Sequence, residues 1–142
     1  MSDISEEPLK SFNSQIIEEF RANGGKVAMF GDAPVVILHT IGAKSGQLRE
    51  TPLVALVEDD GMYVFASAAG APKHPAWYHN LKSNPEITVE YGTDSFTARV
   101  EELPEDEGQA KIRAQGAIMP QFLEYIESAA PRLIPAFAIT RL

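Results

Sequence analysis

The sequence predicts an α+β fold, mainly β, in which mostly antiparallel strands close into a small barrel flanked by helices. Two tight turns, Asp59-Asp60-Gly61 and Gly92-Thr93-Asp94, support this prediction because each joins two segments with the pattern of paired strands. The predicted order of elements is a helix, three strands, a helix, two strands, helices and a last strand. Short antiparallel strands in this order close most easily into a barrel. Residues 1–142 are predicted to form a single domain.

The first predicted element is an amphipathic helix over residues 9–22. Residues 1–8 before it are polar and acidic and are predicted to be disordered, and Asn23-Gly24-Gly25 ends the helix. The apolar side chains that recur at helical spacing are Leu9, Phe12, Ile16, Ile17 and Phe20. This face favours packing on the core or on another subunit. Weak contact with a membrane surface is the alternative, although the polar face is not rich in Lys or Arg.

The predicted strands begin at residue 35. They span residues 35–41, 49–58, 62–67, 87–91, 95–102 and 133–142. Pro75 begins a short helix that ends at Asn84-Pro85. Two more helices are predicted after it, one over residues 104–115 that ends at Gly116, and one near residues 120–129.

Composition excludes several classes of function. The net charge is −8, from 12 Lys and Arg against 20 Asp and Glu, and phosphate backbones need a basic face, so nucleic acid is not an expected partner. There is no cysteine, so disulfides, thiolate catalysis and cysteine zinc sites are excluded. The acidic N-terminus does not resemble a signal peptide, and no apolar run approaches the ~20 residues of a membrane span. The protein is expected in the cytoplasm, at most peripheral to a membrane, and its oligomeric state stays open.

Two segments concentrate the residues that can bind a ligand: residues 40–53, TIGAKSGQLRETPL, and residues 66–85, ASAAGAPKHPAWYHNLKSNP. Each follows an apolar strand, and loops held on rigid strands often carry function. Together they contain a third of the 12 cations of an acidic protein, namely Lys44, Arg49, Lys73 and Lys82.

The first segment has the composition of an anion site. Residues 42–46 can present backbone N–H groups, the Ser45 hydroxyl and the Lys44 ammonium to one oxyanion, with the Arg49 guanidinium just beyond. The Gly-x-x-x-x-Gly-Lys spacing of a P-loop is absent. A plain hairpin with solvated cations is the alternative, and spacing alone favours it slightly.

The second segment suits a flat ligand, because its small residues 66–70 let a ring lie close to the backbone. Trp77 is either a buried anchor or a pocket wall. His74 and His79 share no helical face and have no third ligand nearby, so no metal site is predicted, and His39 is expected to be a satisfied barrel histidine. No nucleophile–base pair has a distinctive spacing, so demanding chemistry is expected to come from a bound cofactor.

These two segments resemble the deazaflavin-dependent nitroreductase family, the split-barrel reductases that use coenzyme F420. The resemblance runs over residues 35–142 and implies a split β-barrel related to FMN-binding barrels, with reduced F420 as hydride donor. It implies an oxidoreductase whose small-molecule acceptor is flat and electron-poor: a quinone, an unsaturated lactone of the coumarin or aflatoxin type, or a nitroaromatic compound.

The resemblance also implies roles for individual residues. The phosphate and acidic tail of the cofactor would be bound by Lys44, Ser45 and Arg49. The strand beside it would be lined by Thr51, Pro52, Leu53 and Val54. The deazaflavin ring would lie against Ala66, Ser67 and Ala68, and the short helix would complete the site with Ala76, Trp77, Tyr78 and Asn80.

The implied substrate pocket contains Val54, Met119, Phe122 and Tyr125. A well-known member of the family has tyrosines at the first three of these positions, so a more apolar pocket is expected here. Tyr125 is then the phenol expected to orient substrate or relay a proton, with Ser67 as the second catalytic candidate. Two other functions stay open, an FMN-dependent oxidoreductase on the same barrel and a non-enzymatic deazaflavin carrier or sensor.

Overall fold

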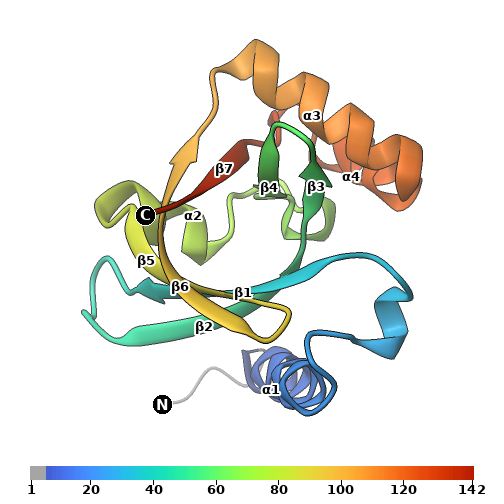
Figure 1. Cartoon of the computed structure of the whole chain (residues 1–142). Helices are drawn as coiled ribbons and strands as arrows, with labels where there is room; N and C mark the ends of the chain where they lie inside the picture. Colours follow the sequence, from blue (N-terminus) through green and yellow to red (C-terminus); the bar gives the residue numbers. More distant parts are fainter. Residues whose placement is uncertain (1–5) are drawn as a thin grey trace.

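The computed structural model describes residues 6–142, with side chains from Phe12 onward. Seven strands form one antiparallel sheet in the order β2-β1-β5-β6-β7-β4-β3 (Figure 1). The strands are β1 Val35–Ile41, β2 Leu48–Val54, β3 Leu56–Glu58, β4 Gly61–Phe65, β5 Glu86–Tyr91, β6 Asp94–Glu102 and β7 Ala136–Arg141. The helices are α1 Glu6–Ala22, α2 Ala76–Ser83, α3 Glu105–Ile118 and α4 Gln121–Ala129, with two short 3-10 helices, η1 Ala28–Phe30 and η2 Ala68–Gly70.

The sheet is strongly curled, and its connectivity explains why. β2 and β3 are the two edge strands, yet only Ala55 separates them in the chain. One residue advances the chain by less than 4 Å, which cannot cross a flat sheet of seven strands. The two edges must therefore approach each other at Ala55, which is buried and donates its N–H to the carbonyl of Pro34 at 2.9 Å. This curled antiparallel sheet confirms the predicted small barrel with flanking helices (Figure 1).

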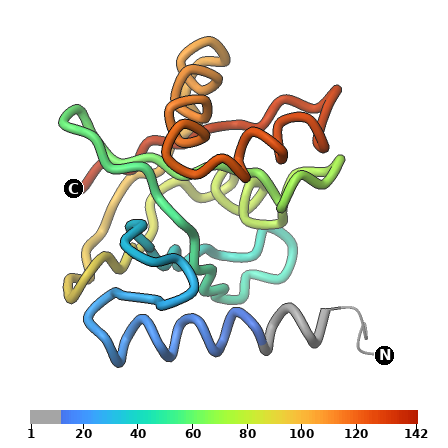
Figure 2. The backbone as a smooth tube through the Cα atoms, turned by 90° about the vertical axis from the view of Figure 1, so that its right-hand side faces the viewer, coloured from blue at the N-terminus to red at the C-terminus, as the bar shows by residue number. Residues whose placement is uncertain are grey.

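The apolar run at the start of β1 reflects burial on both faces of this strand. Val36 and Leu38 point into the main core, where they pack with residues such as Trp77 and Phe137. Val35 and Ile37 point the other way and pack against α1. Figure 2 shows α1 on one side of the molecule and the pair α3 and α4 on the opposite side.

Helix α1 packs on the sheet, as its apolar face predicts. Ile16, Ile17 and Phe20 are at most 9% exposed and lie in one cluster with Val35 and Ile37. The sheet therefore covers Ile16, Ile17 and Phe20, while Phe12 of the same predicted face is 42% exposed. The alternative of membrane contact is not supported. The helix begins at Glu6, three residues before the predicted start, while residues 1–5 and the side chain of Leu9 lie outside the described part. Over residues 6–142, no helix has the length and apolar character to cross a membrane.

Both predicted hairpin turns are confirmed. Glu58 pairs with Gly61 and Tyr91 pairs with Asp94, so each turn has a two-residue loop. Three predicted strands differ from the structure by two residues or more. The strand predicted over residues 133–142 begins only at Ala136. The predicted strand over residues 49–58 is divided at Ala55, where the chain changes edges, and the strand predicted over residues 62–67 ends at Phe65.

Gly116 does not end α3, which continues to Ile118. The glycine is buried, and a Cβ atom at this position would overlap the side chain of Leu123. Gly116 is therefore present because α4 approaches α3 closely here, and its role is packing rather than helix termination.

Candidate cofactor site

The loop between β1 and β2, residues 42–47, is a compact turn. The N–H of Gly42 donates to the carbonyl of Gln47 at 2.8 Å, and the N–H of Gly46 donates to the carbonyl of Gly42 at 2.9 Å. The Ser45 hydroxyl oxygen accepts the N–H of Gln47 at 3.1 Å. The turn thus uses one lone pair of Ser45 itself and leaves the Lys44 side chain exposed.

Helix α2 connects this loop to the second segment. The Asn80 side-chain oxygen accepts the N–H of Ala43 at 2.9 Å, and its amide nitrogen donates to the Thr40 hydroxyl at 3.3 Å. Asn80 and Thr40 are buried, at 7% and 0% exposure. The structure therefore brings the two sequence segments together, and the Asn80 amide is engaged at both ends, with Ala43 of the loop and with Thr40 of β1.

The cations of the two segments differ in their partners. Lys82 pairs with Glu102 at 2.9 Å, which raises its pKa and leaves it committed to that carboxylate. Within residues 12–142, where side chains are described, Lys44, Arg49 and Lys73 pair with no carboxylate and are exposed. In a chain with 20 acidic residues, unpaired exposed cations on these two segments can attract anions.

The loop after β4, residues 66–71, has an unusual backbone. Ala68 and Ala69 have φ values of 48° and 53°, and Gly70 follows with 82°. A left-handed conformation costs a residue with a Cβ atom roughly 1–2 kcal/mol, so two consecutive alanines persist there only because neighbours hold them. Such strained segments are concentrated at functional sites.

Helix α4 supplies one of these neighbours. The Ser128 hydroxyl donates to the carbonyl of Gly70 at 2.8 Å. A Cβ atom on Gly70 would lie 2.9 Å from Cβ of Ser128 and 3.2 Å from Cα of Tyr125, so only glycine fits beneath the helix. This contact places Tyr125 on the helix that covers the loop containing Ser67. Its phenol oxygen accepts a hydrogen bond from the Gln121 side chain at 3.0 Å.

The second neighbour is Arg132, which sequence reasoning missed. Its five N–H donors are directed at the carbonyls of Ala66, Ser67 and Ala71 and at Nδ1 of His74, over 2.8–3.1 Å. Among the residues with described side chains, no carboxylate pairs with it. The available signal was a lone cation in an otherwise apolar stretch, residues 129–139.

His74 accepts the Arg132 hydrogen bond on Nδ1, which requires the neutral ring. Burial, the Arg132 charge and the nearby His79 all lower the pKa of His74, consistent with that state. The ring of His74 stacks on Tyr78 with centroids 4.1 Å apart. Arg132 therefore ties the loop of residues 66–71 to α2 as well as to the segment before β7.

The remaining predicted residues of α2 have distinct surroundings. Trp77 is 7% exposed and packs edge-on against Phe137 at 5.5 Å, as a core anchor would. Tyr78 is half-buried, and its hydroxyl donates to Glu102 at 3.3 Å, while Ala76 is exposed. On β2, an edge strand, the predicted residues that are half-buried are Thr51, Pro52, Leu53 and Val54.

The predicted substrate residues are only partly gathered. Phe122 is buried at 6% exposure, between Phe65 and Tyr125 at centroid distances of 5.9 and 5.3 Å. Met119 is half-buried, and its sulfur accepts a weak hydrogen bond from Gln115 at 3.6 Å. Val54 lies at the end of β2, paired with Val35. A second apolar cluster packs α3 and α4 against the sheet, and Phe122 lies in its interior. Tyr125 and Met119 are partly buried at the edge of this cluster.

A shallow pocket of about 150 Å³ opens between α2 and the start of α3. Among the predicted site residues, only Tyr78 lines it, together with His74, Glu102 and Glu105. Two carboxylates at its wall do not suit an anionic cofactor. This pocket is therefore separate from the site that the two loops outline.

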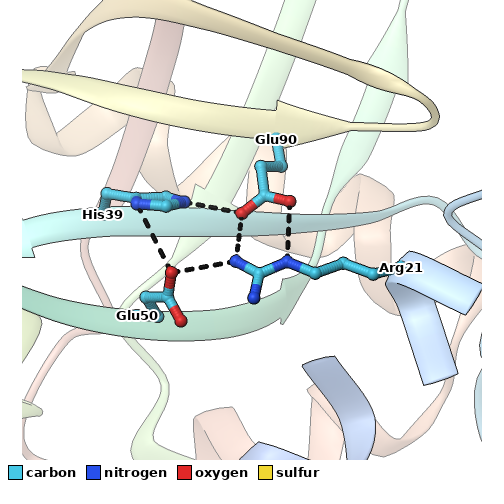
Figure 3. Close-up of polar contacts among 4 residues, drawn as sticks. All are labelled: Arg21, His39, Glu50 and Glu90. Atoms are coloured by element: carbon cyan, nitrogen blue, oxygen red, sulfur yellow. Dashed lines mark hydrogen bonds and ion pairs between the residues drawn. The ribbon is translucent and has the colours of Figure 1, made fainter. Parts of the chain in front are cut away.

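His39 belongs to a polar cluster beneath α1 (Figure 3). Its Nε2 lies 2.6 Å from Glu90, and Arg21 donates to both Glu90 at 2.6 Å and Glu50 at 2.8 Å. These hydrogen bonds, that of Arg21 above all, lower the pKa of Glu90. His39 and the two glutamates are metal-ligand types within 4.8 Å of one another, but the guanidinium already bridges the carboxylates. The cluster therefore fastens α1 to the sheet, and His39 is hydrogen-bonded as expected.

The curled sheet and the two loops beside α2 define a split-barrel protein. A solved structure described as an F420-H2 dependent reductase is 37% identical, with a TM-score of 0.64, and the match covers 75% of this chain and 93% of that one. A second, described as a domain-swapped dimer, is 32% identical with a TM-score of 0.66, covering 93% and 98%. The predicted split-barrel fold is thereby confirmed.

The chain belongs to the F420H2-dependent quinone reductase family, whose model matches residues 13–140. An F420H2-dependent quinone reductase of Mycobacterium tuberculosis is 34% identical over 96 residues, which cover 66% of this chain and 64% of that protein. The match thus spans slightly less than two thirds of this relative. These findings confirm the predicted family, its oxidoreductase class and F420 as the cofactor of the family.

Proposed function

We propose that the protein transfers a hydride from reduced coenzyme F420 to a flat, electron-poor acceptor, and that a quinone is its main acceptor class. Family membership supports the cofactor and the acceptor. The observation in the structure that carries the proposal is the set of unpaired cations on loops that α2 joins to a strained loop of small residues.

The described residues fit this cofactor. Lys44 and Arg49 are exposed and unpaired, so they can bind the phosphate and acidic tail without first losing a carboxylate partner. Ala66, Ser67 and Ala68 carry small side chains on a loop with a fixed backbone, which suits close approach of a planar ring. Residues 51–54, which are proposed to line the cofactor, lie on the edge strand β2 and are half-buried.

When bound, the reduced cofactor supplies a hydride, which is two electrons and one proton, and a quinone needs one further proton to become the hydroquinone. The protein would contribute by holding the hydride donor and the acceptor close together in the right orientation and by excluding water. Tyr125 is the proposed phenol beside the acceptor, since α4 packs directly on the loop that carries Ser67. The Ser67 hydroxyl is the second proposed contact.

The partly apolar border formed by Met119 and Tyr125 favours quinones over strongly polar acceptors. Unsaturated lactones of the coumarin type and nitroaromatic compounds are proposed as secondary acceptors, because they share the flat, electron-poor shape.

The test has two stages. Binding of oxidised F420 is measured by titration of its fluorescence, and turnover is measured with F420H2 and a soluble naphthoquinone, followed by the return of the deazaflavin absorbance. Binding with quinone-dependent oxidation supports the proposal, and absence of F420 binding overturns it. Binding without turnover on quinone, lactone and nitroaromatic acceptors would indicate a carrier or sensor instead. Tight FMN binding in place of F420 would indicate a flavin enzyme.

A further inference from the structure

We propose that Arg132 is a positioning residue of this reductase: its guanidinium fixes the loop of residues 66–71 in the conformation that receives the cofactor ring. The inference rests on the proposed function, because it assigns the ring of F420 to that loop. It adds a residue that belongs to neither sequence segment and lies between α4 and β7.

Four of the five hydrogen bonds of Arg132 go to the loop of residues 66–71, and the fifth goes to His74. A guanidinium has five N–H donors in a rigid fork. Here Nε and one Nη2–H donate to Ala71 at 3.1 and 2.8 Å, and the other Nη2–H donates to Ser67 at 3.0 Å. Nη1 donates to Ala66 and contacts His74, both at 3.0 Å. Every donor is therefore engaged, and all but one of the acceptors are backbone carbonyls of the loop.

These bonds hold a conformation that the loop would not adopt by itself. Ala68 and Ala69 lie in the left-handed region, which costs an alanine free energy. Arg132 binds the carbonyls on both sides of them, at residues 66–67 and at residue 71. The rigid guanidinium thus holds these carbonyls at the spacing that they have in the strained loop.

The same hydrogen bonds also orient the backbone N–H groups of Ser67 and Ala68. In a planar trans peptide, the N–H points away from the C=O. Because the carbonyls of Ala66 and Ser67 face Arg132, the N–H groups of Ser67 and Ala68 face away from it. Within the described residues, neither N–H has an acceptor. Arg132 therefore leaves two donors on the side of the loop away from it, where they could donate to a carbonyl oxygen of the cofactor ring, and its charge polarises the peptides that carry them.

A test of this role compares two arginine-to-lysine variants. Arg132→Lys keeps the charge, but its single ammonium cannot reach acceptors on both sides of the loop. Arg113→Lys makes the same chemical change at an exposed position of α3. The dissociation constant of F420 is measured at a temperature at which both variants are folded, as judged by their melting curves. We expect at least a roughly tenfold weaker binding for Arg132→Lys and less than about a twofold change for Arg113→Lys.

A second measurement separates positioning from bulk stability. Arg132→Ala is titrated with F420 in the presence and absence of millimolar methylguanidinium, with Arg113→Ala as the control. Recovery of affinity in the Arg132 variant alone supports the role of the fork. In the wild-type protein, the amide resonances of Ser67 and Ala68 are expected to move downfield when F420 binds.

The outcomes distinguish this proposal from the proposed function. If the wild-type protein binds F420 and folded Arg132→Lys binds it equally well, Arg132 is not a positioning residue, while the function stands. The positioning role is likewise overturned if methylguanidinium restores nothing. If the wild-type protein binds no F420, the proposed function itself is wrong.

Discussion

The two loops that α2 brings together are held in different ways. Residues 42–47 form a turn closed by its own backbone, with the exposed Lys44, one tie to Asn80 and the exposed Arg49 just beyond it on β2. Residues 66–71 are held from outside, by Arg132 and Ser128, in a strained conformation. A flexible anionic tail needs charge more than shape, whereas a rigid ring needs a fixed surface. In the proposed function, the first loop and Arg49 therefore attract the anionic tail of the cofactor by charge, and the second loop holds a fixed surface for its ring.

The substitution with the largest expected effect, Trp77→Ala, tests whether α2 is a rigid element between the two loops. Trp77→Ala removes a buried ring from the main core and should lower the free energy of unfolding by ~3–5 kcal/mol. Chemical denaturation measures this. A small loss of stability combined with loss of cofactor binding would instead make Trp77 a pocket wall.

Matched glycine substitutions compare the loops directly. Gly70→Ala and Gly46→Ala both place a Cβ atom on a left-handed residue, with φ of 82° and 70°. At Gly46 nothing lies within 4 Å, so only strain of roughly 1–2 kcal/mol is expected. At Gly70 the Cβ atom also meets Ser128 and Tyr125, which should raise the loss to about 2–4 kcal/mol. Equal losses in thermal denaturation would mean that the second loop is no more tightly held than the first.

Arg49→Ala tests the attraction assigned to the first loop. The variant should weaken F420 binding by about 1.5–3 kcal/mol, through loss of charged hydrogen bonds, and leave the melting temperature unchanged. Arg113→Ala serves as an exposed control. The effect should shrink at high salt, because the contact is solvent-exposed. An unchanged affinity would remove Arg49 from the site.

The smallest expected effect concerns Ser45. Because its hydroxyl accepts the N–H of Gln47, Ser45→Ala should cost about 0.5–1 kcal/mol of stability at most. F420 affinity should fall less than it does for Arg49→Ala. A tenfold or larger loss of affinity would show that the hydroxyl contacts the cofactor as well as the turn.

The sequence predicted the parts of the fold that depend on local pattern. Alternation and turn residues located the hairpins at Asp59 and Gly92, and helical spacing located α1 and α2. It did not predict the division of a strand at Ala55, because that break follows from the closure of the sheet. Gly116 was misread for a related reason: a glycine required by the neighbouring Leu123 has the same appearance in sequence as a helix end.

The candidate site shows the same limit. Lys44 and Arg49 could be recognised because exposed cations stand out in an acidic chain. Arg132 could not, because its partners are backbone carbonyls about 60 positions earlier, and carbonyls have no signature in sequence. Phe122 was expected at the pocket, but its burial against Phe65 depends on how α4 lies over β4. The individual roles proposed for these residues remain predictions for the experiments above.

The single residue between β2 and β3 also affects how the fold of this protein could be altered. Ala55 joins the edge strands β2 and β3 directly. The distance between these two strands at Ala55 is therefore set by covalent bonds rather than by side-chain packing. Core substitutions can repack without moving that point. A one- or two-residue insertion beside Ala55 would instead lengthen the connection between the two edge strands and let them move apart, without replacing any side chain of the wild-type protein.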